Sequence, residues 1–150
     1  MYSLNLPSYP VKLSGSKIYP LIFDELRLKW VKLTPEEWVR QHFVHYLISY
    51  KGYPAALMAN EVQLKVGSKL LRADAVLYRR DGSPRVVMEF KQPGVSITEK
   101  VVRQAMAYNS ILHVDVIMIS NGLEHYAFRI KESNHVLQPM AELPNYVELP

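Results

Sequence analysis

The sequence predicts an α/β (α+β) protein whose elements follow the order αβββαββ, with a mixed five-stranded β-sheet flanked by helices. Three observations lead to this expectation: a capped helical pattern, three strand patterns separated by turn residues, and a second helical pattern that leads into two more strands. The helical patterns cover residues 34–50 and 96–112, and the strand patterns cover residues 60–66, 73–78, 85–91, 114–120 and 124–130. The third strand, the second helix and the fourth strand form a βαβ unit, so we expect these two strands to be parallel, with a right-handed crossover.

Length and composition indicate one globular domain. The chain has 150 residues, of which 49% are apolar and 21% charged, as in ordinary soluble proteins. It contains no cysteine, which excludes a disulfide framework and thiolate-ligated zinc and fits a reducing compartment. No apolar run approaches the roughly 18 residues of a membrane span. We therefore expect a cytoplasmic protein without membrane contact. The net charge of +4 permits a polyanionic partner but does not require one.

The domain is expected to have three parts. Residues 1–33 form an N-terminal arm that docks through apolar side chains such as Leu4 and Leu6, residues 34–130 form the core, and residues 131–150 form a polar surface tail. Within the arm, residues 22–31 fit a strand or a helix face equally well, and the pattern leaves this open.

The first helix has a well-defined start. Thr34 is the predicted N-cap, Pro35 occupies the first helical position, and Glu37 stands at the third, which completes a capping box. On this local pattern, the Glu37 carboxylate has a sufficient role in bonding the N-cap amide.

The central hairpin places three charged side chains on one face. If Asp81-Gly82 form a two-residue type I′ turn, the directly paired residues are Tyr78 with Arg85, Val76 with Val87, and Asp74 with Glu89. Lys91 lies two residues beyond Glu89 and therefore shares that face.

Two ionised carboxylates about 5 Å apart repel by roughly 0.8 kcal/mol in water, and by more near protein. A divalent cation such as Mg²⁺, which takes oxygen ligands, converts this repulsion into binding. The other interpretation is that Lys91 simply neutralises a half-exposed sheet face. The apolar run around Glu89 indicates an interior strand, where unpaired charges are costly. The two interpretations are about equally supported by these residues alone.

Further polar and basic residues lie on the second helix and near the hairpin. Gln104 and Tyr108 are four apart in the second helix, on a stripe separate from its apolar face. Arg72 is one of several basic residues near the hairpin, and for each of them solvation at the surface is the simpler role.

The ordered set of motifs resembles the PD-(D/E)XK nuclease superfamily, and most closely the N-terminal nuclease domain of the type I restriction endonuclease R subunit. The matching stretches cover about residues 34–125: Pro35 to Gln41, Gly52-Tyr53-Pro54, Arg72-Ala73-Asp74, Glu89-Phe90-Lys91, Gln104-x-x-x-Tyr108 and Ser120-Asn121-Gly122. The resemblance implies a restriction-endonuclease-like core and Mg²⁺-dependent DNA hydrolysis, with Mn²⁺ as a substitute.

The resemblance also implies a role for each matching residue. Asp74 and Glu89 correspond to the metal-binding acids, and Glu37 to the helical acid that completes the site. Lys91 corresponds to the lysine that positions the attacking water, while Gln104 and Tyr108 correspond to a motif that holds the nucleic acid and the metal surroundings.

The chain departs from the family pattern in two ways. Ala73 replaces the proline of the superfamily's name, and no part resembles the helicase-like motor of the R subunit. The expected partners are therefore DNA and either restriction-modification subunits or a second copy of the chain. The alternatives are a nuclease-fold binding module with little or no catalysis, and a structure-specific junction nuclease.

Overall fold

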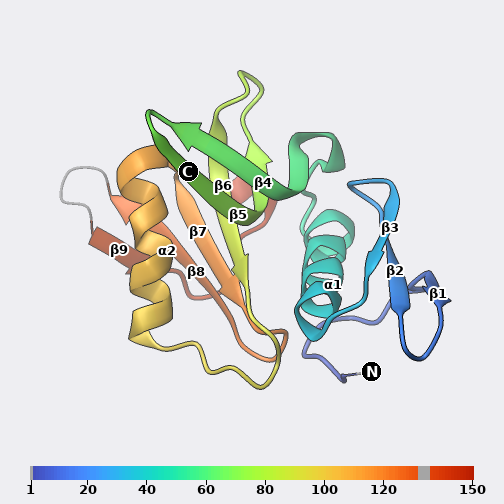
Figure 1. Ribbon diagram of the computed structural model, residues 1–150. Helices are drawn as coiled ribbons and strands as arrows, with labels where there is room; N and C mark the ends of the chain where they lie inside the picture. The colour runs from blue at the N-terminus through green and yellow to red at the C-terminus, as the bar shows by residue number, and fades with distance from the viewer. Residues whose placement is uncertain (1, 132–135) are drawn as a thin grey trace.

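Two β-sheets and two α-helices make up the computed structural model, which describes residues 2–131 and 136–150, except for the side chains of Val66 and residues 108–111. Figure 1 shows the arrangement in layers: helix α2 (Glu99–Leu112), the large sheet, helix α1 (Pro35–Tyr50), and a small sheet on the far side of α1. Among the described residues, no helix has the length and apolarity needed to cross a bilayer.

The large sheet has six strands in the order β4-β5-β6-β7-β8-β9. They are β4 (Met58–Val66), β5 (Lys69–Tyr78), β6 (Pro84–Phe90), β7 (Val116–Ser120), β8 (His125–Lys131) and β9 (Val136–Pro139). Strands β6 and β7 are parallel and joined through α2, while all other neighbours are antiparallel, so the predicted βαβ unit is confirmed. The short 3-10 helices Ala55–Leu57 and Tyr146–Glu148 lie outside the sheet.

The expectation of five strands followed by a polar surface tail is wrong at the C-terminal end. Strand β9 pairs with β8 through contacts such as Ile130 with Leu137. Leu143 and Leu149 then pack into the core beyond it. The prolines and polar residues of this segment gave no strand signal in the sequence. Proline is nevertheless tolerated in an edge strand, because one side of such a strand forms no hydrogen bonds to a neighbouring strand.

The large sheet buries an apolar layer on each face. One cluster combines α1 residues such as Phe43 and Leu47 with alternate residues of the central strands, including Met88 and Met118. The other cluster lies under α2 and includes Val87 and Ile117 among its central-strand residues. Strands β6 and β7 are therefore covered on both faces, which explains their nearly continuous apolar sequences.

The N-terminal arm is in large part a sheet, contrary to expectation. Strands β1 (Leu13–Gly15), β2 (Pro20–Asp24) and β3 (Lys29–Lys32) form a three-stranded antiparallel sheet. The ambiguous residues 22–31 thus form strand, turn and strand rather than a helix. The turn is held by Asp24 Oδ1, which accepts hydrogen bonds from the amides of Leu26 at 2.8 Å and Arg27 at 2.9 Å. Residues before Leu13 do dock on the core, through Leu4 and Leu6 as expected.

The central hairpin keeps the predicted register next to the charged residues but not at its tip. Val76 pairs with Val87, as expected, whereas Tyr78 pairs with Pro84 rather than with Arg85. Residues 79–83 form the loop, and a bulge beside Tyr78 absorbs the shift in register that a loop of this length introduces. The Asp81 side chain closes this loop, because its Oδ1 accepts from the amide of Ser83 at 2.9 Å.

Candidate active site

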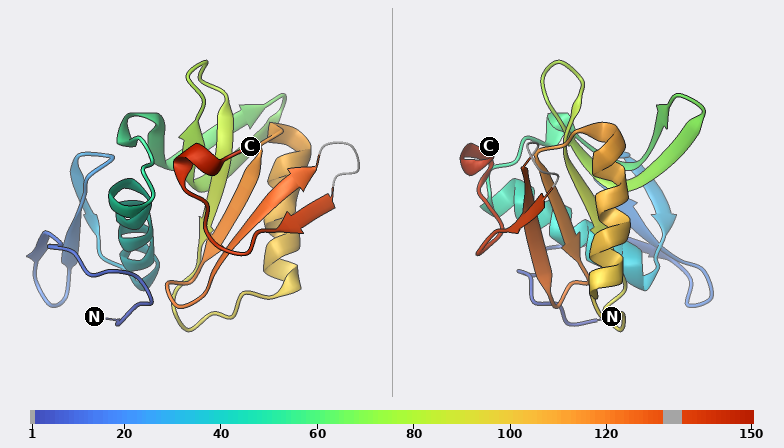
Figure 2. Two further views of the ribbon diagram at one scale, coloured as in Figure 1. Left: turned by 180° about the vertical axis from the view of Figure 1, so that it is seen from behind. Right: turned by 90° about the vertical axis from the view of Figure 1, so that its left-hand side faces the viewer.

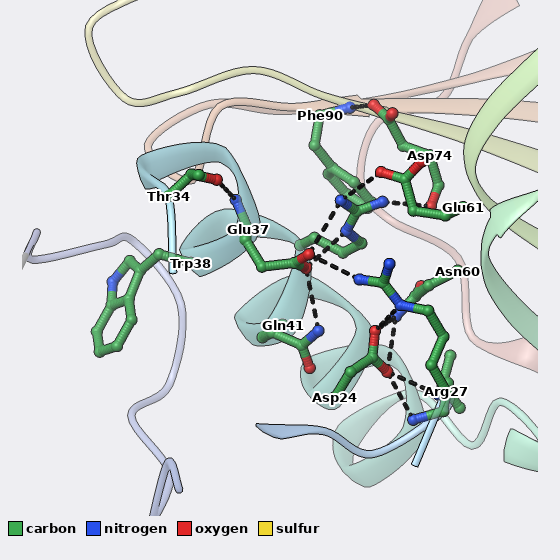
Figure 3. A network of polar contacts seen from close by, with 12 residues as sticks. Asp24, Arg27, Thr34, Glu37, Trp38, Gln41, Asn60, Glu61, Asp74 and Phe90 are labelled. Carbon is green, nitrogen blue, oxygen red and sulfur yellow. Dashed lines mark hydrogen bonds and ion pairs between the residues drawn. The ribbon is translucent and has the colours of Figure 1, made fainter. Parts of the chain in front are cut away.

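The two central carboxyl groups meet at the end of the β5–β6 hairpin. The pair Ala75–Met88 precedes Asp74 and Glu89 in the same register, which makes these two residues cross-strand neighbours. Asp74 Oδ2 accepts a hydrogen bond from the amide of Phe90 at 2.7 Å, a contact that Figure 3 shows from close by. The carboxyl groups of Glu89 and Asp74 lie close enough for Asp74 to raise the pKa of Glu89. The predicted pairing of the two acids is therefore present.

The surroundings of the Glu89 carboxyl group disfavour its ionised form. Its Oε1 atom is buried and has no hydrogen-bond partner among the described residues. Burial raises the pKa of Glu89 to about 9, with a further contribution from the neighbouring charge of Asp74, while Lys91 acts in the opposite direction. The two carboxyl groups therefore disfavour each other's ionised form, and Lys91 offsets only part of this effect on Glu89.

A cavity of about 220 Å³ opens beside Glu89. Strand β6 and the residue that follows it supply Glu89 and Lys91, and the first turns of α2 supply Val101, Gln104 and Ala105. The crossover helix thus returns Gln104 to the strand end from which the chain departed. Of the predicted site residues, the structure brings together Asp74, Glu89, Lys91 and Gln104.

Glu37 does not join this group. It is buried near the start of α1, where Arg40 Nε donates to Oε2 at 2.7 Å and Arg27 Nη2 donates to Oε1 at 2.7 Å. Gln41 Nε2 adds a third contact at 3.1 Å (Figure 3). The capping box is only half formed, since Thr34 Oγ1 accepts from the Glu37 amide while the Glu37 carboxylate faces these three partners. The geometry thus gives no support to Glu37 as a metal ligand.

The buried Arg40 connects Glu37 to the main chain of the site. Arg40 Nη1 donates to the backbone oxygen of Asp74 at 2.9 Å, and Arg40 Nη2 donates to Glu61 Oε1 at 2.7 Å. Glu61 has a φ of 53°, a conformation that few residues other than glycine adopt. Such strain persists only where surrounding contacts enforce it, and here two arginines do so, because Arg72 Nη2 also reaches Glu61 Oε2 at 2.5 Å.

Arg72 therefore has a partner other than nucleic acid. Its side chain is 70% exposed and forms an ion pair with Glu61 on the neighbouring strand. This ion pair is sufficient to explain the position of the Arg72 side chain without a contact to a phosphate. The side chain of Tyr108 lies outside the described residues, although its position falls within α2.

Glu36 interacts electrostatically with the two acids, and no motif in the sequence indicated it. Partial burial raises its pKa, and the charge of Asp74 raises it further, whereas Arg40 and Lys91 lower it. Glu36 in turn contributes to the raised pKa of Glu89. A signal for Glu37 was present in the sequence: Arg40 and Gln41 follow Glu37 by three and four residues, the spacing of neighbours on a helix. This spacing predicts that Glu37 contacts residues of its own helix rather than the hairpin acids.

The donor set fits a hard divalent cation. Among the described residues, no group of three His, Cys, Asp or Glu side chains has the geometry to hold a metal ion. Mg²⁺, however, is commonly held by one or two carboxylates together with waters and substrate phosphates. Asp74 and Glu89 supply two carboxyl groups, and the unpartnered Glu89 Oε1 is an acceptor that a cation would satisfy. These two residues are the ones that would hold it.

A comparison with protein families finds one match, which covers residues 35–144 and is described as the type I restriction enzyme R protein N terminus. The chain belongs to this family. The matched region begins at the first residue of α1 and includes α2 and all six strands of the large sheet, the hairpin among them. The small sheet β1–β3 lies outside it.

The fold of this R-protein family member has a counterpart among solved structures. It is similar to a fragment described as an HsdR subunit of a type I restriction enzyme from Vibrio vulnificus YJ016, with a TM-score of 0.54 and 22% identity. The alignment covers 78% of this chain and 24% of the other, so the chain spans about a quarter of that fragment. A comparison with curated protein sequences finds no match.

Proposed function

We propose that this chain is a metal-dependent nuclease domain that hydrolyses phosphodiester bonds in DNA. The observation that carries the proposal is the pair of partly buried carboxyl groups, Asp74 and Glu89, with a buried and unpartnered oxygen on Glu89 and with Lys91 beside it. Membership of the R-protein family supports a nuclease-like role at a coarser level. Because the similar fragment is far longer, we also propose that the domain works with other subunits of a restriction system.

Each residue has a distinct role in this proposal. Asp74 and Glu89 would hold Mg²⁺, which when bound would supply charge stabilisation at the phosphate and lower the pKa of a bound water. The Lys91 ammonium orients the attacking water and stabilises its deprotonated form. Gln104, on the opposite wall of the cavity, donates or accepts hydrogen bonds to the substrate or to that water.

The test separates metal binding from chemistry. Asp74→Ala is expected to lose both Mg²⁺ binding, measured by calorimetry, and cleavage of plasmid DNA. Lys91→Ala is expected to keep metal binding nearly intact while cleavage falls by roughly 10²–10⁴-fold, the usual contribution of a positioned proton-handling group. Lys65→Ala, on the exposed surface of β4, is the matched lysine control and should cleave like the wild type.

Two results would count against the proposal. If wild-type protein and Asp74→Ala cleave plasmid, linear and branched DNA equally in Mg²⁺ and Mn²⁺, the activity is a contaminant. If neither metal binds to the wild type, the two-carboxylate site is not a metal site.

A binding module is the second candidate, and one observation favours it. Glu37, which the resemblance assigns to the metal site, is instead held by two arginines and a glutamine. A domain that has given this acid a structural role can retain the fold and its contacts with DNA while losing catalysis. DNA binding by the wild type without cleavage in either metal would establish this function in place of the first.

A further inference from the structure

The small sheet carries most of the net charge of the protein. Within residues 1–33 the charged residues are Lys12, Lys17, Arg27, Lys29 and Lys32 against Asp24 and Glu25, an excess of three positive charges out of the net +4. Arg27 and Asp24 neutralise each other in an ion pair, and Asp24 is fully buried. The exposed excess therefore comes from lysines. It lies outside the region that the family match covers.

One face of this sheet is aromatic and exposed. Strand β2 turns Ile22 and Asp24 inward, where both are fully buried, and the alternation places Phe23 on the outer face. The pairing puts Trp30 opposite Phe23, and Lys32 opposite Leu21 on the same face. Figures 1 and 2 show the sheet as the outermost layer, beyond α1. Trp30 is 45% exposed there, and Tyr19, just before β2, is 58% exposed.

Lysines and aromatic rings alternate on this surface. Lys12 Nζ lies 5.2 Å from the centre of the Phe23 ring, and Lys32 Nζ lies 5.9 Å from that of Tyr19. The Phe23 and Trp30 rings meet edge to face, with centroids 5.3 Å apart, which holds the Trp30 ring in place. We call this surface, made of Lys12, Tyr19, Phe23, Trp30 and Lys32, the aromatic–lysine face. Its acidic neighbour Glu25 is 3.9 Å from Lys12, but both side chains are well exposed and the contact is weak.

We propose that the aromatic–lysine face binds single-stranded DNA. Exposed aromatic rings stack on bases whose faces are open, and neighbouring lysines follow the phosphates, which is how proteins bind single strands without reading sequence. In a duplex the base faces are covered by their neighbours, so the rings would have no counterpart there. The choice of DNA over RNA rests on the proposed function, whereas the choice of a single strand rests on the face itself.

Other occupants fit this surface less well. Lysine is depleted from interfaces between proteins. Here, however, a lysine lies over two of the three rings: Lys12 over Phe23 and Lys32 over Tyr19. A second copy of the chain would bring two positively charged faces together, which costs electrostatic energy. A polyanion with planar bases satisfies both the lysines and the rings.

The first experiment uses fluorescence, since the protein has only two tryptophans, Trp30 and Trp38. Oligothymidylate is titrated into the full chain in EDTA, so that no metal-dependent cleavage takes place. We expect quenching in the wild type and in Trp38→Phe. Trp30→Phe keeps a ring for stacking, and should therefore bind the oligonucleotide, as measured by anisotropy, but show no quenching.

The second experiment measures affinity and its salt dependence by anisotropy. Trp30→Ala should weaken binding about tenfold, in the range of one lost base–aromatic stack. Lys12→Ala and Lys32→Ala should each lower the slope of log K against log salt by about 0.7. Tyr126→Ala and Lys131→Ala are the matched controls, because both residues are exposed on β8, away from the small sheet, and should bind like the wild type.

Several outcomes would overturn this proposal: no quenching in Trp38→Phe, unchanged affinity in Trp30→Ala, tighter binding to duplex than to a single strand of the same sequence, or binding to RNA alone. The test is separable from that of the nuclease function. Binding at the face is measured in EDTA, without the metal that cleavage requires, so a failure of binding at the face would leave metal-dependent cleavage to be judged on its own.

Discussion

The adjacent residues Glu36 and Glu37 at the start of α1 have different surroundings. Glu37 is inside and neutralises Arg27 and Arg40, whereas Glu36 keeps contact with solvent and experiences the charge of Asp74. Successive residues on a helix point about 100° apart, so one position decides between a structural ion pair and the candidate active site. The resemblance between sequences is too coarse to make this choice.

We predict that substitution of these two glutamates separates stability from metal affinity. Glu37→Gln leaves the buried Arg40 and the partly buried Arg27 short of negative charge, and should lower the free energy of unfolding by about 3 kcal/mol, the low end for a broken buried pair. Glu36→Gln removes a charge that repels Asp74, so stability should be kept, while Mg²⁺ affinity falls. Chemical denaturation and calorimetry measure the two effects. The opposite pattern would return Glu37 to the metal site.

The buried carboxylate of Asp24 connects strand β2 of the small sheet to strand β4 of the large sheet. Asp24 at the end of β2 forms an ion pair with Arg27 and accepts hydrogen bonds from Asn60 of β4 at 3.1 and 3.3 Å. Burial by itself would raise the pKa of Asp24, but the hydrogen bonds from Arg27 and Asn60 outweigh it, so that the pKa is lowered. This carboxylate therefore links the small sheet to the large one.

The lowered pKa of Asp24 predicts how stability depends on pH. A carboxyl group whose pKa is lower in the folded state stabilises the fold above its unfolded pKa of about 3.9, and this contribution disappears as pH falls through the folded pKa. Asp24→Asn should thus be less stable than wild type at pH 7, and the gap should close below about pH 4. Glu25→Gln, at the neighbouring exposed position, is the control and should show no such gap. A gap that persists at low pH would assign the loss to shape rather than charge.

Three parts of the molecule, the N-terminal segment, α1 and the large sheet, contact one another at Gly122. Gly122 in the β7–β8 turn has a φ of +87°, and its carbonyl accepts from the Asn5 amide at 2.8 Å. A Cβ atom at Gly122 would lie 2.6 Å from Leu4 Cδ2 and 3.1 Å from Val39 Cγ2. The N-terminal segment, α1 and the large sheet therefore meet at a point where no side chain fits.

We predict that alanine at this glycine destabilises the protein more than alanine in an open turn. Gly82 has nearly the same φ, +88°, but no atom within 4 Å of a built Cβ. Gly82→Ala should cost only the roughly 1–2 kcal/mol of the left-handed conformation. Gly122→Ala should cost that amount plus about 1–3 kcal/mol for displaced core side chains. Urea denaturation of both variants gives the difference, and equal losses would mean that Leu4 moves aside freely.

The sequence determined the elements whose signals are local. The capped start of α1, the βαβ unit and the pairing that brings Asp74 beside Glu89 follow from caps, periodicity and turn residues at short range. The register survived even though the predicted turn was wrong, because the bulge at Tyr78 compensated for the longer loop. A buried hydrophobic pattern specifies register more strongly than the turn does, since a slip of one residue would expose the whole apolar face.

The tertiary structure alone decided which polar side chains meet. Residues 13–32 form a sheet because β1 and β3 each gain hydrogen bonds from β2, a gain that their own sequences do not signal. Arg40 donates hydrogen bonds to Glu37, to Glu61 and to the backbone carbonyl of Asp74, which is 34 residues away in the sequence. Burial makes such choices strict, because a charge removed from water must find partners wherever the packed elements supply them.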